Sequence, residues 1–291
     1  LTASINEART ELSGNDVLWK SNDCLGLFCG TKFVNAPFTT TAGGTTSADF
    51  TGDPTDPSGS EAEVFYAYYP YSAHAVLEGS VVSGLSIPAV QTFATKSFAT
   101  ELCPMATSGA DYSRLAFRTI GTVLKFQVTG QKNVTKIELT GNNGEALAGD
   151  YTIDFVGETP EMKFSGTETT LTLTCSEPVA LNDASATEFY FVLPAGVEFT
   201  KGITVKVYTD DNAEPMVKEY ASPLTTRPNK LVTVKAFTYS VPVTSIEEAN
   251  EALSKGTSGV TITSTTDLTV PSTLEIPNAF GHGTSTSVEI E

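Results

Sequence analysis

Short segments that alternate apolar and polar residues follow one another along most of this chain, and turn residues separate them. The alternation is clear from Val123 to Val128, from Leu171 to Leu173 and from Ile203 to Tyr208. The stretches GNNG at 141–144 and RPN at 227–229 mark two of the breaks, because Gly, Asn and Pro supply the backbone angles of tight turns. A period of two residues indicates strands, and frequent turns indicate sheets joined by hairpins. The sequence therefore predicts an all-β fold of sandwiches, with very little helix before residue 240.

An aromatic run, FYAYYPYS at residues 65–72, is the second strong constraint on the fold. Aromatic side chains favour strands. Pro70 cannot donate to a ladder, so the strand ends there or becomes an edge. Alternation places Tyr66 and Tyr68 on one face and the other aromatic residues on the opposite face. Such a strand favours core packing, with one face buried and the other covered by a loop. The alternative is a sugar-stacking platform made by Tyr66 and Tyr68.

The aromatic run is one of a series of short segments that occur in a fixed order. The series is Arg9-Thr10, VLW at 17–19, DCLGLF at 23–28, the run itself, IPAVQT at 87–92, LAF at 115–117 and LKF at 124–126. Over residues 1–240 this order resembles the fimbrillin family, the subunits and accessory proteins of type V pili on Gram-negative anaerobes. The resemblance implies two transthyretin-like β-sandwiches in tandem and a role in cell adhesion, as a stalk, anchor or tip protein.

The resemblance also implies a location at the cell surface, in the fimbrium or the outer membrane, reached by export through the periplasm as a lipoprotein. Residue 1 already lies in a strand-like pattern, so we expect that a leader has been removed. The lipid-bearing cysteine would then lie upstream of residue 1. No run approaches the ~20 apolar residues of a membrane helix.

We predict three parts: an amino-terminal β-sandwich over residues 1–112, a second sandwich over 113–240, and an appendage over 241–291. The appendage opens with a helix at 245–256, where Ser245 and Glu248 form a capping box. Short apolar pairs such as VTI at 260–262 follow it. This part is either a small helix-and-strand appendage packed on the second sandwich or the start of a parallel β-helix.

Arg9 has a specific role under the resemblance. In pilin subunits of the family, a trypsin-like protease cuts after an arginine just beyond the first strand. The released strand opens an apolar groove that a strand from the next subunit fills. Leu1, Ala3 and Ile5 alternate as such a detachable strand should, and Arg9-Thr10 follows at the corresponding place. The alternative is that Arg9 is a surface residue that is never cut.

Composition and motifs exclude several classes of function. A net charge of −17 and the lack of a Lys/Arg cluster argue against nucleic-acid binding. The two histidines, His74 and His282, have no second ligand type at metal spacing. There is no phosphate-binding loop and no Gly-x-Ser-x-Gly elbow. The acidic stretch DDNAE at 210–214 lacks the length of a calcium loop and is typical of a hairpin tip. We therefore expect no enzyme activity, no cofactor and no metal.

Four cysteines are too few for a disulfide scaffold in a chain of 291 residues. Cys24 and Cys29 lie five residues apart in a predicted strand, so they should point to opposite faces. We expect buried thiols, with a pair between Cys24 and Cys103 as the alternative.

Three functions compete at this point. The first is a pilus subunit or a tip or accessory adhesin, whose partners are other pilus subunits, further copies of itself, and a receptor or glycan on a host or bacterial surface. The second is a glycan-binding lipoprotein of the outer membrane. The third is the amino-terminal part of a larger β-helix protein that processes polysaccharides.

Overall fold

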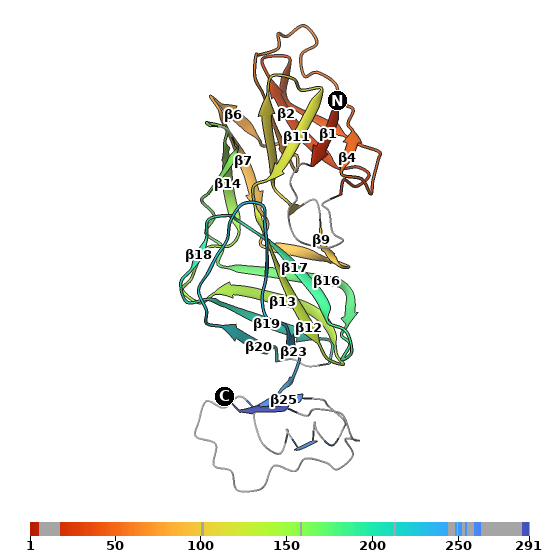
Figure 1. The fold of residues 1–291 in the computed structure, drawn as a ribbon, viewed down its shortest axis with the longest axis vertical. Helices are drawn as coiled ribbons and strands as arrows, with labels where there is room; N and C mark the ends of the chain where they lie inside the picture. Colours follow the sequence, from red (N-terminus) through yellow and green to blue (C-terminus); the bar gives the residue numbers. More distant parts are fainter. Residues whose placement is uncertain are drawn as a thin grey trace.

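A computed structural model describes residues 1–5, 18–99, 102–157, 159–211 and 214–243, and then residues 248, 250, 251, 254, 259–262 and 287–290. Nearly all regular structure in this part of the chain is β-strand, so the predicted all-β class is confirmed. The molecule is elongated, with the amino terminus towards one end and the last described strands at the other (Figure 1). Within the described ranges, no helix has the length and hydrophobicity to cross a bilayer.

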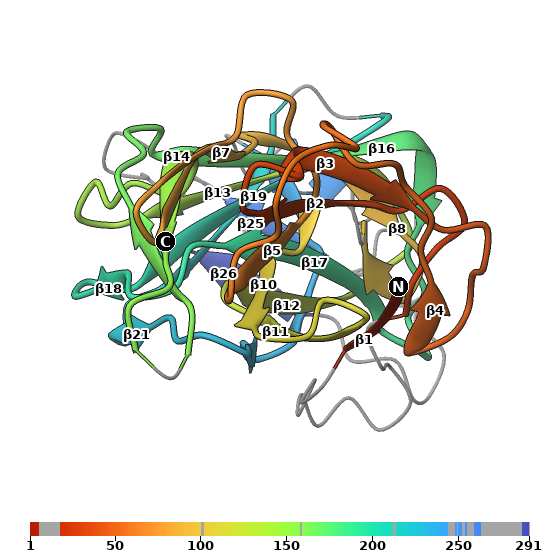
Figure 2. The ribbon, with the colours of Figure 1, turned by 90° about the horizontal axis from the view of Figure 1, so that it is seen from above.

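A seven-stranded sheet occupies the amino-terminal end of the molecule. Its order is β3 (Phe33–Thr39), β2 (Cys24–Cys29), β5 (Phe65–Tyr69), β10 (Met105–Gly109), β11 (Arg114–Thr119), β1 (Thr2–Ile5) and β4 (Ser47–Asp49). Neighbours are antiparallel except β1 and β11, which run parallel. Seen from above, β1 and β4 lie on one side of the molecule, and β7 (Val81–Ile87) and β14 (Gly149–Asp154) lie on the other (Figure 2).

Trp19 lies at the centre of the core beneath this sheet. Its ring makes edge contacts with Phe50, Tyr69 and Phe117, at centroid distances of 4.9, 5.3 and 5.7 Å. The side chain is 1% exposed. Edge-to-face pairs of aromatic rings stabilise a fold by more than their buried area alone. Through these contacts Trp19 holds the strands of the sheet against the segment around Phe50.

Two further sheets enclose the core of the second half. One has the order β20 (Met216–Tyr220), β19 (Ile203–Thr209), β13 (Asn133–Gly141), β16 (Thr170–Ala180), β8 (Val90–Ala94) and β9 (Ser97–Phe98). The other has β17 (Thr187–Leu193), β12 (Thr122–Thr129) and β22 (Lys230–Thr233), and β23 (Phe237–Thr238) also pairs with β12. The predicted alternation holds along β19 and along β12 from Leu124 onwards, and these apolar residues face this core, whereas Val123 belongs to the core beneath the first sheet.

Strands on both sides of residue 112 pair with each other. A four-stranded sheet contains β15 (Glu161–Phe164), β14 (Gly149–Asp154), β7 (Val81–Ile87) and β6 (Val76–Glu78). In addition, β8 pairs in parallel with β16, and β18 (Glu198–Phe199) pairs with β21 (Leu224–Thr225). Strand β11, from Arg114, belongs to the first sheet, and the next strand, β12, belongs to the sheet of β17 and β22. The boundary at residue 112 stays a prediction, and the strands β7 and β8 before it pair with β14 and β16 beyond it.

The last described strands form a small parallel sheet. Strand β25 (Gly259–Ile262) lies between β24 (Val241–Val243) and β26 (Ser287–Ile290), and both neighbours run parallel to it. Residues 248, 250, 251 and 254 are helical and lie inside the range predicted for a helix. Ser245, the predicted cap, lies outside the described residues.

All four cysteines are free thiols, so the alternative pair between Cys24 and Cys103 is not formed. Cys29 and Cys103 are buried, whereas Cys24 and Cys175 are half-buried. Burial raises the pKa of Cys103 to about 12 and that of Cys175 to about 11. These two side chains are therefore neutral thiols near pH 7, and they pack as small apolar groups.

Candidate functional site

Strand β1 is held in the first sheet by main-chain bonds on both of its sides. Ala3 is the register partner of Leu115 in β11 and of Ala48 in β4. At its start, Leu1 and Phe50 exchange main-chain bonds, Leu1 N to Phe50 O at 3.1 Å and Phe50 N to Leu1 O at 2.8 Å. At its end, the Ile5 amide donates to a loop carbonyl at 2.9 Å. The strand therefore fills a slot between two other strands.

The side chains of β1 alternate as the sequence predicts. Ala3 is fully buried and Ile5 is 8% exposed, while Leu1 packs partly buried against the same core. The indole Nε1 of Trp19 donates to the carbonyl of Ala3 at 3.1 Å. The apolar face of β1 thus covers the buried cluster around Trp19, which we call the Trp19 core. Trp19 also hydrogen-bonds to the backbone of β1. Arg9 and Thr10 lie outside the described residues, so the structure does not place the predicted cleavage point.

Strand β5, which contains the aromatic run, is buried on both faces because each face packs against a different core. Tyr69 belongs to the Trp19 core, whereas Tyr66 and Tyr68 belong to the core of the second half. The faces follow the predicted alternation. The second face is covered by packed side chains, among them Phe155, whose ring lies 5.0 Å from that of Tyr66.

Tyr68 has no exposed surface, so it offers nothing on which a sugar ring could stack. Its hydroxyl donates to Asn35 Oδ1 at 2.6 Å and lies 3.0 Å from Ser72 O, and burial raises its pKa. Gly26 on the neighbouring strand makes room for it, since a Cβ there would lie 2.2 Å from the tyrosine ring. Of the two predicted platform residues, only Tyr66 has partial exposure.

Gln91 is a structural residue that the sequence gives little reason to single out. It is 2% exposed on β8, and its side-chain amide bridges to the edge of β17. Its Nε2 donates to Val192 O at 2.8 Å, and Val192 N donates to its Oε1 at 2.9 Å. One side chain thus satisfies both main-chain groups of a fully buried residue, as a neighbouring strand would.

We expect Gln91→Leu to lower the free energy of unfolding by about 2–4 kcal/mol, because it leaves a buried N–H and a buried C=O without partners at about 1–3 kcal/mol each. Denaturant unfolding of the two proteins measures the loss. The control is Gln131→Leu at an exposed turn, which should change stability by less than about 0.5 kcal/mol. Equal stability of Gln91→Leu and the wild type would contradict this role.

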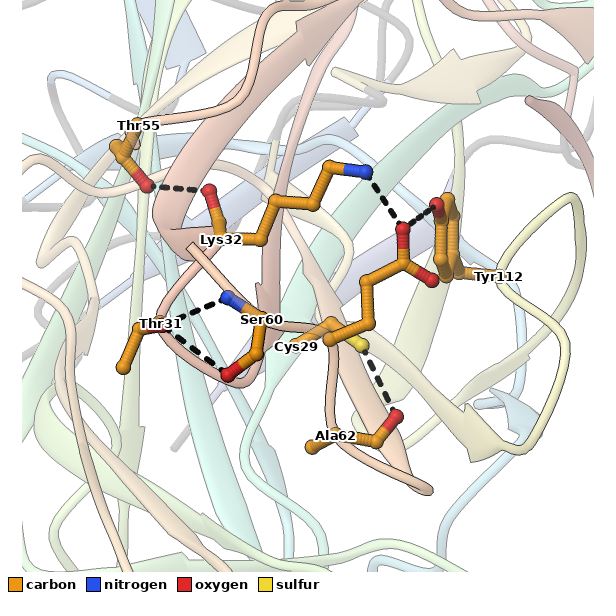
Figure 3. Close-up of polar contacts among 8 residues, drawn as sticks. Cys29, Thr31, Lys32, Thr55, Ser60, Ala62 and Tyr112 are labelled. Carbon is orange, nitrogen blue, oxygen red and sulfur yellow. Dashed lines mark hydrogen bonds and ion pairs between the residues drawn. The ribbon is translucent and has the colours of Figure 1, made fainter. Parts of the chain in front are cut away.

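A polar cluster fixes the tip of the β2–β3 hairpin (Figure 3). Lys32 Nζ donates to Glu61 Oε1 at 2.6 Å, and the Tyr112 hydroxyl donates to the same oxygen at 2.8 Å. Thr55 Oγ1 donates to the Lys32 carbonyl at 3.1 Å. The hydrogen bond from Lys32 and then that from Tyr112 lower the pKa of Glu61. The cluster ties three loops together, so we assign it a structural role.

Among the described residues, no group of three or more His, Cys, Asp or Glu side chains is placed so that it could hold a metal ion. At the predicted hairpin tip, Asp210 accepts a bond from Asn133 and Asp211 pairs with Lys132. Both carboxylates are therefore engaged with neighbouring side chains.

Several solved structures are similar to this chain, and three of them are described here. One is a protein assigned to cell adhesion from Bacteroides uniformis, with a TM-score of 0.46 and 14% identity, covering 82% of this chain and 91% of that chain. Another such protein, from Bacteroides fragilis, has a TM-score of 0.42 and 12% identity, covering 77% and 81%. The third is the tip fimbrial protein Mfa3 from Porphyromonas gingivalis with a C-terminal truncation, with a TM-score of 0.31 and 12% identity, covering 78% and 82%.

The descriptions of these structures agree with the family that the sequence resembles. No protein-family model and no curated protein matches the chain. Because the identities and TM-scores are low, we infer function from the sequence and the geometry of this chain and not from these structures.

Proposed function

We propose that this chain is a subunit, or a tip or accessory adhesin, of a surface pilus, and that it assembles by β-strand addition at the position of β1. The observation that carries the proposal is the slot of β1. A strand of four residues lies between β11 and β4, and its alternate side chains Ala3 and Ile5 enter the Trp19 core.

Removal of β1 would leave main-chain donors and acceptors of β11 and β4 without partners and would uncover the apolar core between them. An unpaired edge of this kind is a template for another strand. In strand addition, main-chain bonds supply affinity and alternate side chains supply specificity. The slot fits an extended segment with small or aliphatic residues at alternate positions, from another pilus subunit or from a second copy of this chain.

Arg9 and Thr10 are the proposed processing site, four residues beyond the end of β1 in the sequence. A cut there would separate β1 from every other described strand of the sheet. Excision of β1 by trypsin, followed by its replacement with a synthetic strand, tests the proposal. The role is non-enzymatic and belongs at the cell surface, with an outer-membrane lipid anchor as part of the same proposal.

For the carboxyl-terminal part we propose the opening coils of a parallel β-helix. The pairing registers align Val241, Val260 and Val288 in one column of register positions, and Val243, Ile262 and Ile290 in a second. Residues two apart along a strand share a face, so the sequence has an aliphatic residue at both positions of one face in each strand. Parallel strands with matched aliphatic positions are typical of a solenoid. This observation favours the β-helix over a packed appendage, and with it the third candidate function, part of a larger polysaccharide-processing protein.

A designed disulfide tests the columns. Val260→Cys with Val288→Cys places two thiols on neighbouring parallel strands in register, within the range that a disulfide spans. We expect this pair to oxidise, with the bond located by peptide mass mapping. In the control, Val260→Cys with Glu289→Cys, the shift of one residue turns the second thiol to the opposite face, so it should stay reduced. Oxidation of both pairs alike would show that the strands are not held in this register.

A further inference from the structure

A pocket of about 280 Å³ lies at the open side of the second half, between the edges of its two sheets. Strand β20 lines one side of the pocket, and residues 235–238, which include β23, line the other. In the part of the chain that the structure describes, β20 pairs only with β19, and β23 pairs only with β12. Figure 1 shows β20 and β23 at the lower end of the second half, away from β1. The pocket shares no residue with the β1 slot, so a ligand bound there adds a function beyond the one proposed above.

Three side chains of β20 reach the pocket because they share the inner face of their sheet. Met216 and Lys218 are the register partners of Val207 and Val205, and both valines are fully buried in the core. Cross-strand partners lie on one face, and so do residues two apart along a strand. Tyr220 therefore lies on the same face as Met216 and Lys218, and all three line the pocket.

The floor of the pocket is aromatic and held in place. The ring of Tyr220 lies 6.4 Å from the ring of Phe126 and 6.4 Å from that of Phe237, and both of these are core residues. The Tyr220 hydroxyl donates to the carbonyl of Lys235 at 2.7 Å. Burial raises the pKa of Tyr220 to about 12, so the hydroxyl keeps its proton and this bond near pH 7. Because Tyr220 is half-buried, its ring offers a fixed apolar surface at little cost in side-chain entropy.

Two lysines, Lys218 and Lys235, line the pocket from its opposite sides. None of the ion pairs within the described ranges includes either of them. Glu219 lies between Lys218 and Tyr220 in the sequence and so points to the outer face, where its Oε1 accepts a bond from Asn142 Nδ2 at 3.4 Å. The chain has 34 acidic and 17 basic residues. Two cations at one pocket, without a carboxylate in its lining, therefore favour an anionic ligand.

We propose that this pocket binds a small organic anion, a carboxylate carried on an aromatic or short aliphatic body. The apolar body packs on the ring of Tyr220 and the side chain of Ala236, and the carboxylate accepts hydrogen bonds from the ammonium groups of Lys218 and Lys235. Such charge-assisted bonds are stronger than neutral ones. The volume of the pocket is slightly below the range of drug-sized sites, which limits the ligand to a single ring or a short chain.

An added peptide strand fits this pocket less well. Strand addition needs a straight edge of main chain, but β23 has only two residues, and residues 234–236 before it are not in a strand. The carbonyl of Lys235 already accepts the bond from Tyr220. The pocket thus offers side-chain groups rather than an open ladder.

Saturation-transfer NMR with benzoate, phenylacetate and hexanoate tests the proposal. We expect at least one of these acids to bind with a dissociation constant below about 10 mM, a modest affinity for a small ligand. The matched neutral controls are benzamide, phenylacetamide and hexanamide, and the amide of that acid should bind about fivefold more weakly or less. Acetate, which has the charge but no apolar body, should also bind more weakly than that acid. Added salt should weaken the binding, because it screens charges near the surface.

The double variant Lys218→Gln with Lys235→Gln assigns the binding to this pocket. It removes both cations but keeps two polar side chains, so the affinity for the acid should fall about fivefold or more. The melting temperature should stay nearly unchanged, since surface substitutions have small effects on stability. The control is Lys206→Gln on the neighbouring strand. Lys206 is the register partner of the exposed Val217 and so lies on the outer face of the sheet, and its replacement should not change the affinity.

Four results would overturn the proposal. The first is that none of the three acids binds to the wild-type protein at about 10 mM. The second is that an acid and its amide bind equally well, which excludes recognition of the charge. The third is that the double variant keeps the wild-type affinity, which places the binding elsewhere. The fourth is that a peptide of alternating valine and glutamate binds in a lysine-dependent way while no small acid does, which makes the pocket a peptide site. None of these results bears on the β1 slot.

Discussion

Trypsin should cut this protein after Arg9, and the loss of β1 should lower the free energy of unfolding by about 5 kcal/mol. Burial of an Ile or Leu side chain contributes about 1.5–3 kcal/mol when complete, and Ile5 is buried while Leu1 is partly so. Each main-chain bond to β11 and β4 adds about 0.5–1.5 kcal/mol. Since whole domains are stable by only about 5–15 kcal/mol, the cut protein should unfold at much lower denaturant concentration or self-associate through the open slot. Denaturant unfolding and size-exclusion chromatography measure the two outcomes.

A peptide that copies Leu1 to Ala8 should restore the stability of the cut protein, because it returns the same ladder and the same side chains. The matched control is the same peptide with Ala3→Asp, which would bury a carboxylate at a position with no exposed surface and so should not bind. Arg9→Ala should prevent both the cut and its effects. If trypsin ignores Arg9, or if the cut chain remains a fully stable monomer, strand exchange at β1 is wrong. An accessory adhesin that stands alone on the membrane would then be favoured.

The second large effect should come from Trp19. We expect Trp19→Ala to lower the free energy of unfolding by about 3–5 kcal/mol, because it leaves a cavity in the core and removes contacts with three aromatic rings. It also removes the bond from Nε1 to the Ala3 carbonyl. Thermal unfolding followed by circular dichroism measures the loss.

Trp19→Phe separates packing from the bond to β1. Phenylalanine keeps an aromatic ring in the core but has no N–H to donate. Its loss of unfolding free energy should therefore be smaller than that of Trp19→Ala, with about 1 kcal/mol due to the missing hydrogen bond. The same variant should exchange β1 for the synthetic peptide faster after trypsin treatment. A Trp19→Ala protein as stable as the wild type would show that the indole does not support this sheet.

Local patterns in the sequence predict which residues face inward, and the structure agrees. The alternation at Ala3 and Ile5, and the two faces of the run that contains Tyr68 and Tyr69, follow from a period of two residues alone. What the aromatic run does not reveal is that each face of its strand meets a different core. Aromatic residues on both faces were the available signal.

Long-range pairing is the part that the sequence does not provide. Nothing near Ala3 indicates that its neighbour is Leu115, or that β7 pairs with β14 across the expected boundary. Gln91 resembles an ordinary polar residue in a strand, because its role depends on where the edge of β17 lies. The pocket beside Tyr220 also escapes prediction, since two parts of the chain, residues 216–220 and 235–238, supply its lining from the edges of different sheets.

The parallel pairing of β1 with β11 has a consequence for the order in which the fold forms. During synthesis or export from the amino terminus, residues 2–5 emerge well before their partners at 114–117, which follow more than a hundred residues later. At about 5–20 residues per second, the first strand waits several seconds before its slot exists. Pairings over such separations also form slowly. Strand β1 therefore appears early and settles late, and during that interval the half-built sheet can accept a strand from elsewhere in place of its own.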